Sequence, residues 1–343
     1  MKIEIITTPN HELKETGFGA LDACNSVFDS IIKLGHDVKL TVCKNLSDLT
    51  QVAHRRPDLA ILAVKYISIE NGIDIWLSEF FAKNDINYSG SSRAVLKFDS
   101  DKVLAKAYLM KKGMKTANYF TATPGQYACE ADLPVAFPLF LKPLDAANGN
   151  GIDDLSLVTN YAEFESKMSA LYATFNMPVL AEEYLDGREF SVAIIKTEGG
   201  KLIVSAVEIV PPQSTKGLRI LGEKTKKEDS ELIKKIEEPK VLNKVAKLAI
   251  DAYTRLGIWD FGRIDIKTNK QGHCYFMEAN LVPGMTSGSS YFPRACEIAN
   301  NLTYDEVIQL IVEKGISRSS YAESQYTPKT IANNVGDTHI AAL

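Results

Sequence analysis

The chain has 343 residues, of which 45% are hydrophobic and 24% charged, as in a soluble globular protein. This length exceeds one ordinary hydrophobic core, so two or three domains are expected. The net charge of −4 gives no basic surface, and we expect no nucleic-acid partner. No apolar run approaches the ~18 residues of a membrane span, and the five cysteines include no Cys-x-x-Cys pair. We therefore expect a cytoplasmic protein without a membrane contact, a disulfide framework or a zinc site.

The N-terminal part of the chain alternates short apolar runs with helical patterns. The expected strands are residues 2–6, 38–42 and 59–64, and apolar residues recur at helical spacing over residues 20–34 and 73–83. This alternation predicts an α/β domain with an open, largely parallel sheet over residues 1–96.

The remainder of the chain predicts two α+β lobes and a tail. A helix over residues 99–112 should begin at its acidic start and end before Gly113. Residues 97–185 continue with a strand, a Gly-rich turn, a helix and a strand, which form a central lobe. Residues 186–318 add two strands, a long helix and a hairpin as a C-terminal lobe. Residues 319–343 are polar, lack periodicity and predict a loosely held tail.

The most informative stretch is a predicted β-hairpin over residues 263–280. Period-two alternation places Arg263 and Asp265 on one face of the first strand, and Glu278 and Asn280 on one face of the second. With the turn centred at Gln271-Gly272, Asp265 pairs with Glu278 and Arg263 with Asn280. One face of the hairpin therefore carries two carboxylates, an amide and a guanidinium.

Two carboxylates on opposed strands repel each other unless they are paired or bound to a metal. Carboxylate and amide oxygens are ligands that Mg²⁺ accepts while it keeps other positions for water and phosphate. The alternative is a solvent-facing hairpin edge whose charges have no function. The Pro283-Gly284 turn, which redirects the chain just after Asn280, favours the metal site.

A phosphate-binding turn is predicted after the apolar strand that ends at Lys142-Pro143. Residues 145–151 are rich in Gly and Asn, which tolerate the dihedral angles that let successive N–H groups converge on an anion. The lysine adds a positive charge. The segment lacks the Gly-Lys-Ser/Thr pattern of a P-loop, and a plain connection is the alternative.

Acidic residues flank a second turn. Glu182 and Glu183 end one strand and Glu189 enters the next, so Glu182 could accept a hydrogen bond from an adenine amine and Glu189 one from a ribose. Ordinary solvated carboxylates are the alternative. The lysine-rich residues 222–227 are either solvated surface or a mobile loop that closes over phosphates.

In this order and spacing, the motifs resemble the ATP-grasp superfamily, in particular its D-alanine:D-alanine ligase-like branch, over residues 95–312. They are strand-Lys-Pro with its Gly-rich turn, Glu-Glu-Tyr-Leu-Asp-Gly-Arg-Glu-Phe-Ser-Val, Gly-Arg-Ile-Asp-Ile and Phe-Met-Glu-Ala-Asn-Leu-Val-Pro-Gly. The resemblance implies an ATP-grasp fold, in which an N-terminal parallel-sheet domain accompanies two α+β lobes that enclose ATP. It also implies an ATP-dependent carboxylate-amine ligase that joins two amino acids, or an amino acid and an amine, through an acyl phosphate.

The resemblance further implies roles for individual residues. The nucleotide contacts are Lys102, Lys142, Asn148, Gly149, Gly151, Glu182, Glu183, Leu185 and Glu189. The residues that hold two Mg²⁺ ions, with Mn²⁺ as an alternative, are Asp265, Glu278 and Asn280. The catalytic and acceptor-site residues are Arg263, Lys224, Gly284 and Ser289. We expect ATP and small amino-acid or amine substrates, and a homodimer.

Three segments depart from the D-alanine ligase pattern. They are residues 7–19 near the N-terminus, Thr225 in place of an aromatic residue, and residues 287–292. D-alanine is therefore not the expected preferred substrate. A phosphotransferase and a nucleotide-binding protein without turnover are the alternative functions. His273 on the hairpin turn is the only histidine near these motifs, and the sequence identifies no general base.

Overall fold

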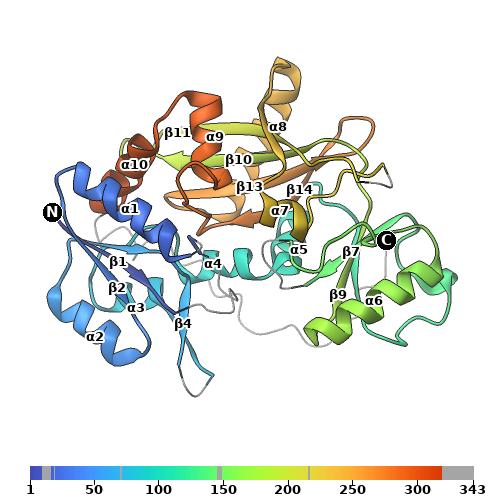
Figure 1. Ribbon diagram of the computed structural model, residues 1–343, viewed down its shortest axis with the longest axis horizontal. Helices are drawn as coiled ribbons and strands as arrows, with labels where there is room; N and C mark the ends of the chain where they lie inside the picture. Colours follow the sequence, from blue (N-terminus) through green and yellow to red (C-terminus); the bar gives the residue numbers. More distant parts are fainter. Residues whose placement is uncertain (10–16, 19, 70–71, 145–148, 215–216, 319–343) are drawn as a thin grey trace.

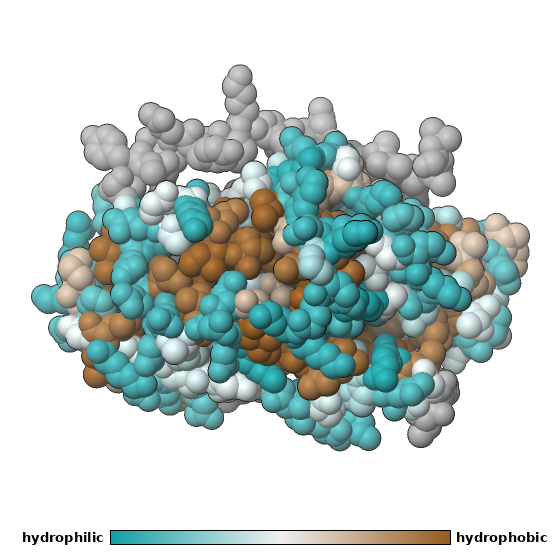
Figure 2. All heavy atoms as spheres, turned by 90° about the horizontal axis from the view of Figure 1, so that it is seen from above, coloured by the Kyte–Doolittle hydropathy of each residue, from teal (hydrophilic) through white to brown (hydrophobic). Residues whose placement is uncertain are grey.

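A computed structural model describes residues 1–9, 17–18, 20–69, 72–144, 149–214 and 217–318. Asn148, part of the N-terminal segment 7–19 and the polar tail lie outside these residues. Figure 1 shows the N-terminal domain and the central lobe at opposite ends of the long axis, with the C-terminal sheet above and between them. Figure 2 shows one face on which hydrophilic side chains surround patches of hydrophobic ones. In the described part of the chain, no helix combines the length and apolar character needed to cross a bilayer.

The N-terminal domain contains a three-stranded parallel sheet in the order β2-β1-β3, as the sequence predicts. Its elements are β1 (Lys2–Thr7), α1 (Leu21–Lys33), β2 (Asp37–Val42), α2 (Leu46–Arg55), β3 (Leu59–Leu62), β4 (Tyr66–Ser68), β5 (Asp74–Trp76) and α3 (Leu77–Lys83). The prediction of a helix over residues 73–83 is wrong at its start, because residues 74–76 pair with β4 in a two-stranded sheet. Helix α2 is absent from the prediction, although Asn45 caps it by accepting a hydrogen bond from the Asp48 N–H.

Two short helices replace the single helix predicted over residues 99–112. They are α4 (Arg93–Ser100) and α5 (Lys102–Lys111). Asp101 separates them because its backbone is extended and its carboxylate accepts a hydrogen bond from the Leu104 N–H, which caps α5. Asp99 therefore belongs to the end of α4.

The central lobe is a four-stranded antiparallel sheet in the order β6-β9-β7-β8, with one helix packed on it. Its elements are β6 (Tyr119–Ala122), a 3-10 turn (Glu130–Asp132), β7 (Leu139–Pro143), β8 (Leu157–Val158), α6 (Tyr161–Phe175) and β9 (Val179–Glu183). The lobe has its own core, in which Phe164 of α6 packs against Phe120 of β6. The buried apolar residues of this lobe thus form a cluster separate from the main core.

The C-terminal lobe is a five-stranded antiparallel sheet in the order β12-β11-β10-β13-β14. Its elements are β10 (Glu189–Lys196), β11 (Leu202–Val210), α7 (Glu223–Glu228), β12 (Leu232–Lys235), α8 (Pro239–Leu256), β13 (Phe261–Thr268), β14 (Cys274–Asn280), α9 (Tyr291–Asn300) and α10 (Tyr304–Ser317). One hydrophobic core runs from β1 and α1 through this sheet to α10. The N-terminal domain and the C-terminal lobe thus share a core, and the predicted boundaries at residues 96, 185 and 318 stay predictions.

Candidate active site

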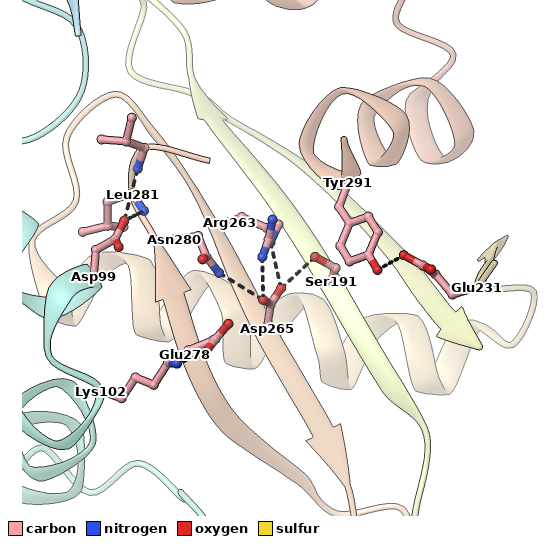
Figure 3. A network of polar contacts seen from close by, with 11 residues as sticks. Asp99, Lys102, Ser191, Glu231, Arg263, Asp265, Glu278, Asn280, Leu281 and Tyr291 are labelled. Carbon is pink, nitrogen blue, oxygen red and sulfur yellow. Dashed lines mark hydrogen bonds and ion pairs between the residues drawn. The ribbon is translucent and has the colours of Figure 1, made fainter. Parts of the chain in front are cut away.

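Strands β13 and β14 form the hairpin that the sequence predicts, with Arg263 opposite Asn280 and Asp265 opposite Glu278 (Figure 3). A β-bulge follows this pair, because Ile266 pairs with Phe276 and Met277 is the extra residue. The bulge leaves the pairing of the four polar residues intact and shifts only the end of the hairpin near the turn. The predicted polar face is therefore confirmed as a structural feature.

Asp265 lies at the centre of this face and accepts four hydrogen bonds. Arg263 donates two of them, from Nε to Oδ1 at 3.0 Å and from Nη2 to Oδ2 at 2.9 Å. The Ser191 hydroxyl donates to Oδ1 at 2.7 Å, and the Asn280 amide donates to Oδ2 at 3.0 Å. Burial alone would lower the pKa of Arg263, but the Asp265 carboxylate outweighs it and raises the pKa. The guanidinium is thus held charged and in a fixed orientation.

Glu278 lies opposite Asp265 and is balanced by a different cation. The Lys102 ammonium of α5 lies 3.4 Å from its Oε2. Burial raises the pKa of Glu278, but Lys102, Lys142 and nearby cations outweigh burial and lower it below the ordinary range. Glu278 is therefore ionised and available as an oxygen donor at neutral pH.

The donor set of this face fits a hard divalent cation. Among the described residues, no group of three or more His, Cys, Asp or Glu side chains converges on one point. Two carboxylates on paired strands, with Asn280 beside them, offer only oxygen donors and leave further positions for water and phosphate oxygens. This is the coordination that Mg²⁺ accepts.

Glu182 forms a buried charge cluster at the other wall of the site. Its carboxylate lies 2.7 Å from the Lys106 ammonium and 2.5 Å from that of Lys142. Burial raises the pKa of Glu182, but the two lysines outweigh it and lower the pKa to about 2. Burial lowers the pKa of Lys106. Lys106 is a site residue that the motifs did not single out, although its position one helical turn after Lys102 on α5 places it on the same face.

A cavity of about 350 Å³ connects these walls. The predicted site residues that line it are Lys102, Lys142, Gly149, Glu182, Glu183, Leu185, Glu189, Arg263, Asp265, Glu278, Asn280, Gly284 and Ser289. Two predicted residues, Gly151 and Lys224, lie outside its lining. The motifs of both lobes therefore converge on one space, as their order in the sequence had suggested.

The lysine-rich segment differs from the prediction. Residues 223–228 form helix α7, so successive lysines point in different directions. The Lys224 side chain is 86% exposed, whereas Lys226 lines the cavity. Burial lowers the pKa of Lys226, although Glu278 opposes that effect. Lys226 is a further functional candidate that the sequence did not indicate. If residues 222–227 are taken as a loop, nothing distinguishes Lys226 from Lys224, because only a helix directs the two side chains to different sides.

The start of α7 packs against the Gly-rich turn of the central lobe. The Glu223 N–H donates to the Ile152 carbonyl at 3.1 Å, and the Gly151 N–H donates to the Glu223 carboxylate at 3.3 Å. A Cβ added at Gly222 would lie 2.4 Å from the Ile152 carbonyl oxygen, so glycine is required there by close approach. These contacts close one side of the cavity.

Two further carboxylates line the predicted nucleotide side. Glu189 accepts a hydrogen bond from the Lys267 ammonium at 3.1 Å, and Glu183 accepts one from the Asn118 amide at 2.9 Å. Leu185, which lies between these two residues in the sequence, is buried and adds apolar surface to the cavity. His273 is exposed on the hairpin turn and does not line the cavity.

Asp99 positions the chain that follows Asn280, a role that the sequence did not show. It accepts hydrogen bonds from the N–H groups of Leu281 at 2.5 Å and Val282 at 3.2 Å (Figure 3). Lys65 of the N-terminal domain lies 2.8 Å from the same carboxylate. Asp99 thus ties the loop that carries Gly284 to two other parts of the molecule.

Tyr291 and Glu231 complete the wall beside Arg263. The Tyr291 ring lies over the Arg263 guanidinium, with 5.4 Å between the guanidinium carbon and the ring centroid. The Tyr291 hydroxyl donates a hydrogen bond to Glu231 Oε1 (Figure 3). Burial, and then Glu231, raise the pKa of Tyr291, so the hydroxyl keeps its proton.

Two α+β lobes enclose this cavity, with lysines on one wall and a polar hairpin on the other. This arrangement is that of the ATP-grasp fold. The crystal structure of D-alanine–D-alanine ligase from Bacillus anthracis complexed with ATP has this fold, with a TM-score of 0.72 and 22% sequence identity. The similarity covers 94% of this chain and 99% of that one.

Sequence relatives narrow the class to a family. Residues 109–313, more than half of the chain, match the family described as D-ala D-ala ligase C-terminus, and the chain belongs to this family. D-alanine–D-alanine ligase A of Brucella melitensis is 30% identical over 224 residues, which cover 64% of this chain and 62% of that protein. D-alanine–D-alanine ligase of Aquifex aeolicus is 27% identical over 309 residues, which cover 85% and 94%. The chain thus spans less than two thirds of the Brucella relative and nearly all of the Aquifex one.

Proposed function

We propose that this protein is an ATP-dependent carboxylate-amine ligase. It joins two amino acids, or an amino acid and an amine, through an acyl phosphate and releases ADP and phosphate. The observation that carries the proposal is the convergence of Lys102, Lys142 and Arg263 with the acidic hairpin face on one cavity. The relatives named as ligases support it.

The nucleotide occupies the side of the cavity between the lobes. Lys102 and Lys142 contact the phosphates, and the backbone at Gly149 adds N–H donors. Leu185 and the strand edge at Glu183 hold the adenine, and Glu189 accepts from the ribose. Both oxygens of Glu182 are engaged by lysines, so this residue orders Lys142 instead of accepting from adenine.

Asp265, Glu278 and Asn280 would hold Mg²⁺, as two ions, with Mn²⁺ as an alternative. When bound, the metal neutralises charge on the β- and γ-phosphates and orients them. Lys102 already lies against Glu278, so the same carboxylate adjoins a lysine that contacts phosphate.

The chain's own groups then serve two chemical steps. Lys102, Lys142 and Lys226 reduce the negative charge of the phosphates while a substrate carboxylate oxygen attacks the γ-phosphorus and ADP leaves. An amine next attacks the acyl carbon, and phosphate leaves. Arg263 stabilises the tetrahedral oxyanion because Asp265 and Tyr291 fix its orientation. The packing of α7 on the Gly-rich turn excludes water, which would hydrolyse the acyl phosphate.

The test is a screen of ADP release with pairs of amino acids and amines, followed by mass spectrometry of the products. A new amide with stoichiometric ADP supports the ligase. ADP with a stable phosphorylated product supports a phosphotransferase, and no ADP with any pair supports binding without turnover. Because three segments depart from the D-alanine ligase pattern, we expect another pair to be preferred over two D-alanines. The homodimer and the cytoplasmic location stay predictions.

A further inference from the structure

Glu231 is a buried carboxylate that lines the cavity just before β12. Glu231 is only 6% exposed. One oxygen, Oε1, accepts the hydrogen bond from the Tyr291 hydroxyl. The other oxygen, Oε2, is buried and accepts no hydrogen bond from the described residues. A buried carboxylate oxygen without a partner is unfavourable, so the site calls for a donor that the described part of the chain does not supply.

Glu183 lines the cavity, is less buried than Glu231 and accepts a hydrogen bond from the Asn118 amide. Apart from Glu231, the remaining cavity carboxylates pair with a cation of the protein. The pairs are Asp265 with Arg263, Glu278 with Lys102, Glu189 with Lys267, Glu182 with Lys106 and Lys142, and Asp99 with Lys65. Glu231 forms no ion pair within the described residues, and its only hydrogen-bond partner there is neutral Tyr291. Asp229, which also lines the cavity, lies 3.9 Å from Arg294. The contrast assigns the missing positive charge to a ligand.

We propose that Glu231 binds a primary ammonium group of a substrate, one that stays protonated while another group reacts. The proposal rests on the ligase function proposed above and names the substrate chemistry at one end of its cavity. Two sources share this chemistry: the α-ammonium of the amino acid whose carboxylate is activated, and the side-chain ammonium of a diamino acid.

The position of Tyr291 supports this assignment. Its ring lies over Arg263, and its hydroxyl contacts Glu231, so the ammonium would lie one tyrosine ring away from the group that stabilises the reacting centre. One small molecule can span the length of a tyrosine ring, so the ammonium at Glu231 and the reacting group at Arg263 can belong to the same substrate. The Tyr291 proton leaves the second carboxylate oxygen free for the substrate, because a neutral hydroxyl donates only once.

The experiment measures binding without turnover, by calorimetry in the presence of Mg²⁺ and a non-hydrolysable ATP analogue. The probes are two matched pairs, each as both enantiomers: alanine against lactate, and lysine against 6-hydroxynorleucine. The proteins are the wild type, Glu231→Gln, and Glu228→Gln as a control for an exposed carboxylate three residues earlier. We expect the wild type to bind the ammonium-bearing member of one pair ~10-fold or more tightly than its hydroxyl analogue.

Glu231→Gln should abolish this preference, and Glu228→Gln should keep it. A preference within the alanine pair identifies an α-ammonium, and one confined to the lysine pair identifies a side-chain ammonium. A wild type that prefers neither ammonium probe, or a Glu231→Gln protein that keeps the preference, overturns the proposal. If Glu231→Gln does not fold, Glu231→Asp should weaken the preference, because the carboxylate is withdrawn by one methylene. An unchanged preference in Glu231→Asp also overturns it.

A separate assay of ADP release and of amide product by the wild type, the latter by mass spectrometry, distinguishes the two proposals. Absence of amide product, with a Glu231-dependent ammonium preference, contradicts the ligase function and leaves the ammonium site standing. Amide formation without that preference contradicts the ammonium site alone.

Discussion

The two ends of the cavity balance their buried charges in different ways. At the end built by α5, β7 and β9, Glu182 is held between Lys106 and Lys142 and needs no ligand to be neutralised. At the end beside α9, the Tyr291 hydroxyl is the one hydrogen-bond partner of Glu231 among the described residues. Under the proposed function, the first arrangement preforms a lysine-rich surface for the phosphates of ATP, whichever amino acid or amine is joined. The second arrangement lacks a cation of the protein and is proposed to bind a substrate ammonium, so selectivity between substrates should depend on that end.

The largest expected effect is on stability, at the balanced end. Glu182→Gln leaves two ammonium groups, Lys106 and Lys142, buried without a counter-charge. We expect a loss of about 3–5 kcal/mol in the free energy of unfolding, measured by urea denaturation. Glu238→Gln removes a more exposed partner of Arg188 and should change stability far less, because solvent screens that pair. Equal small losses in both variants would show that the buried cluster does not stabilise the fold.

The same cluster predicts a dependence of stability on pH. The pKa of Glu182 is lowered from 4.5 to about 2 in the folded protein. Its contribution is therefore fully present above the unfolded value and is lost as pH falls through the folded one. It should amount to on the order of 3 kcal/mol. The difference in unfolding free energy between wild type and Glu182→Gln should shrink between pH 4.5 and 2; a constant difference would contradict this account.

A second prediction concerns the hairpin face. Glu278→Gln keeps the side-chain volume but removes a charged oxygen that faces Lys102 and the proposed metal. We expect turnover to fall at least ~100-fold while the melting temperature stays near that of the wild type. Glu208→Gln, on the same sheet but paired with Arg188, is the control for a lost carboxylate. Near-normal ADP release by Glu278→Gln would remove the metal assignment.

Arg263→Lys tests the boundary between the two ends. Lysine keeps the charge but lacks the fork that donates two hydrogen bonds to Asp265 and the plane that lies against Tyr291. We expect turnover to fall ~10- to 50-fold with less than a ~3-fold change in ATP affinity, from steady-state kinetics and nucleotide titration. Equal losses in both quantities would make Arg263 a nucleotide ligand.

The hairpin could be predicted from the sequence because the two strands and the turn that fix its pairing are adjacent in the chain. Alternation and one turn were enough to pair Asp265 with Glu278, and the bulge at Met277 falls beyond the polar face. The separation of Lys224 from Lys226 has a different cause. The sequence allows solvated surface or a mobile loop there, and only the helical phase of α7 decides that Lys226 lines the cavity while Lys224 is exposed. The catalytic role of Lys224 stays a prediction.

Residues that act across long sequence separations escaped the prediction. Asp99 contacts an N–H group 182 residues away, and Glu231 contacts a hydroxyl 60 residues away. Neither pair belongs to a motif with a fixed spacing. Such contacts follow from how the sheets and helices pack, so they became visible only when the three parts of the molecule were assembled.

Asp99→Asn is expected to have the smallest effect and tests whether the two ends share one support. The amide can still accept hydrogen bonds from the Leu281 and Val282 N–H groups, but it loses the charge that strengthens them and pairs with Lys65. We expect a ~3- to 10-fold rise in KM for the amine substrate with little change for ATP, because the loop leads to Gly284 and not to the lysine wall. Asp101→Asn is the matched control, since asparagine caps a helix as well as aspartate does. Parallel losses for both substrates would mean that this loop positions the whole cavity, and the distinction between its two ends would then be weaker than proposed.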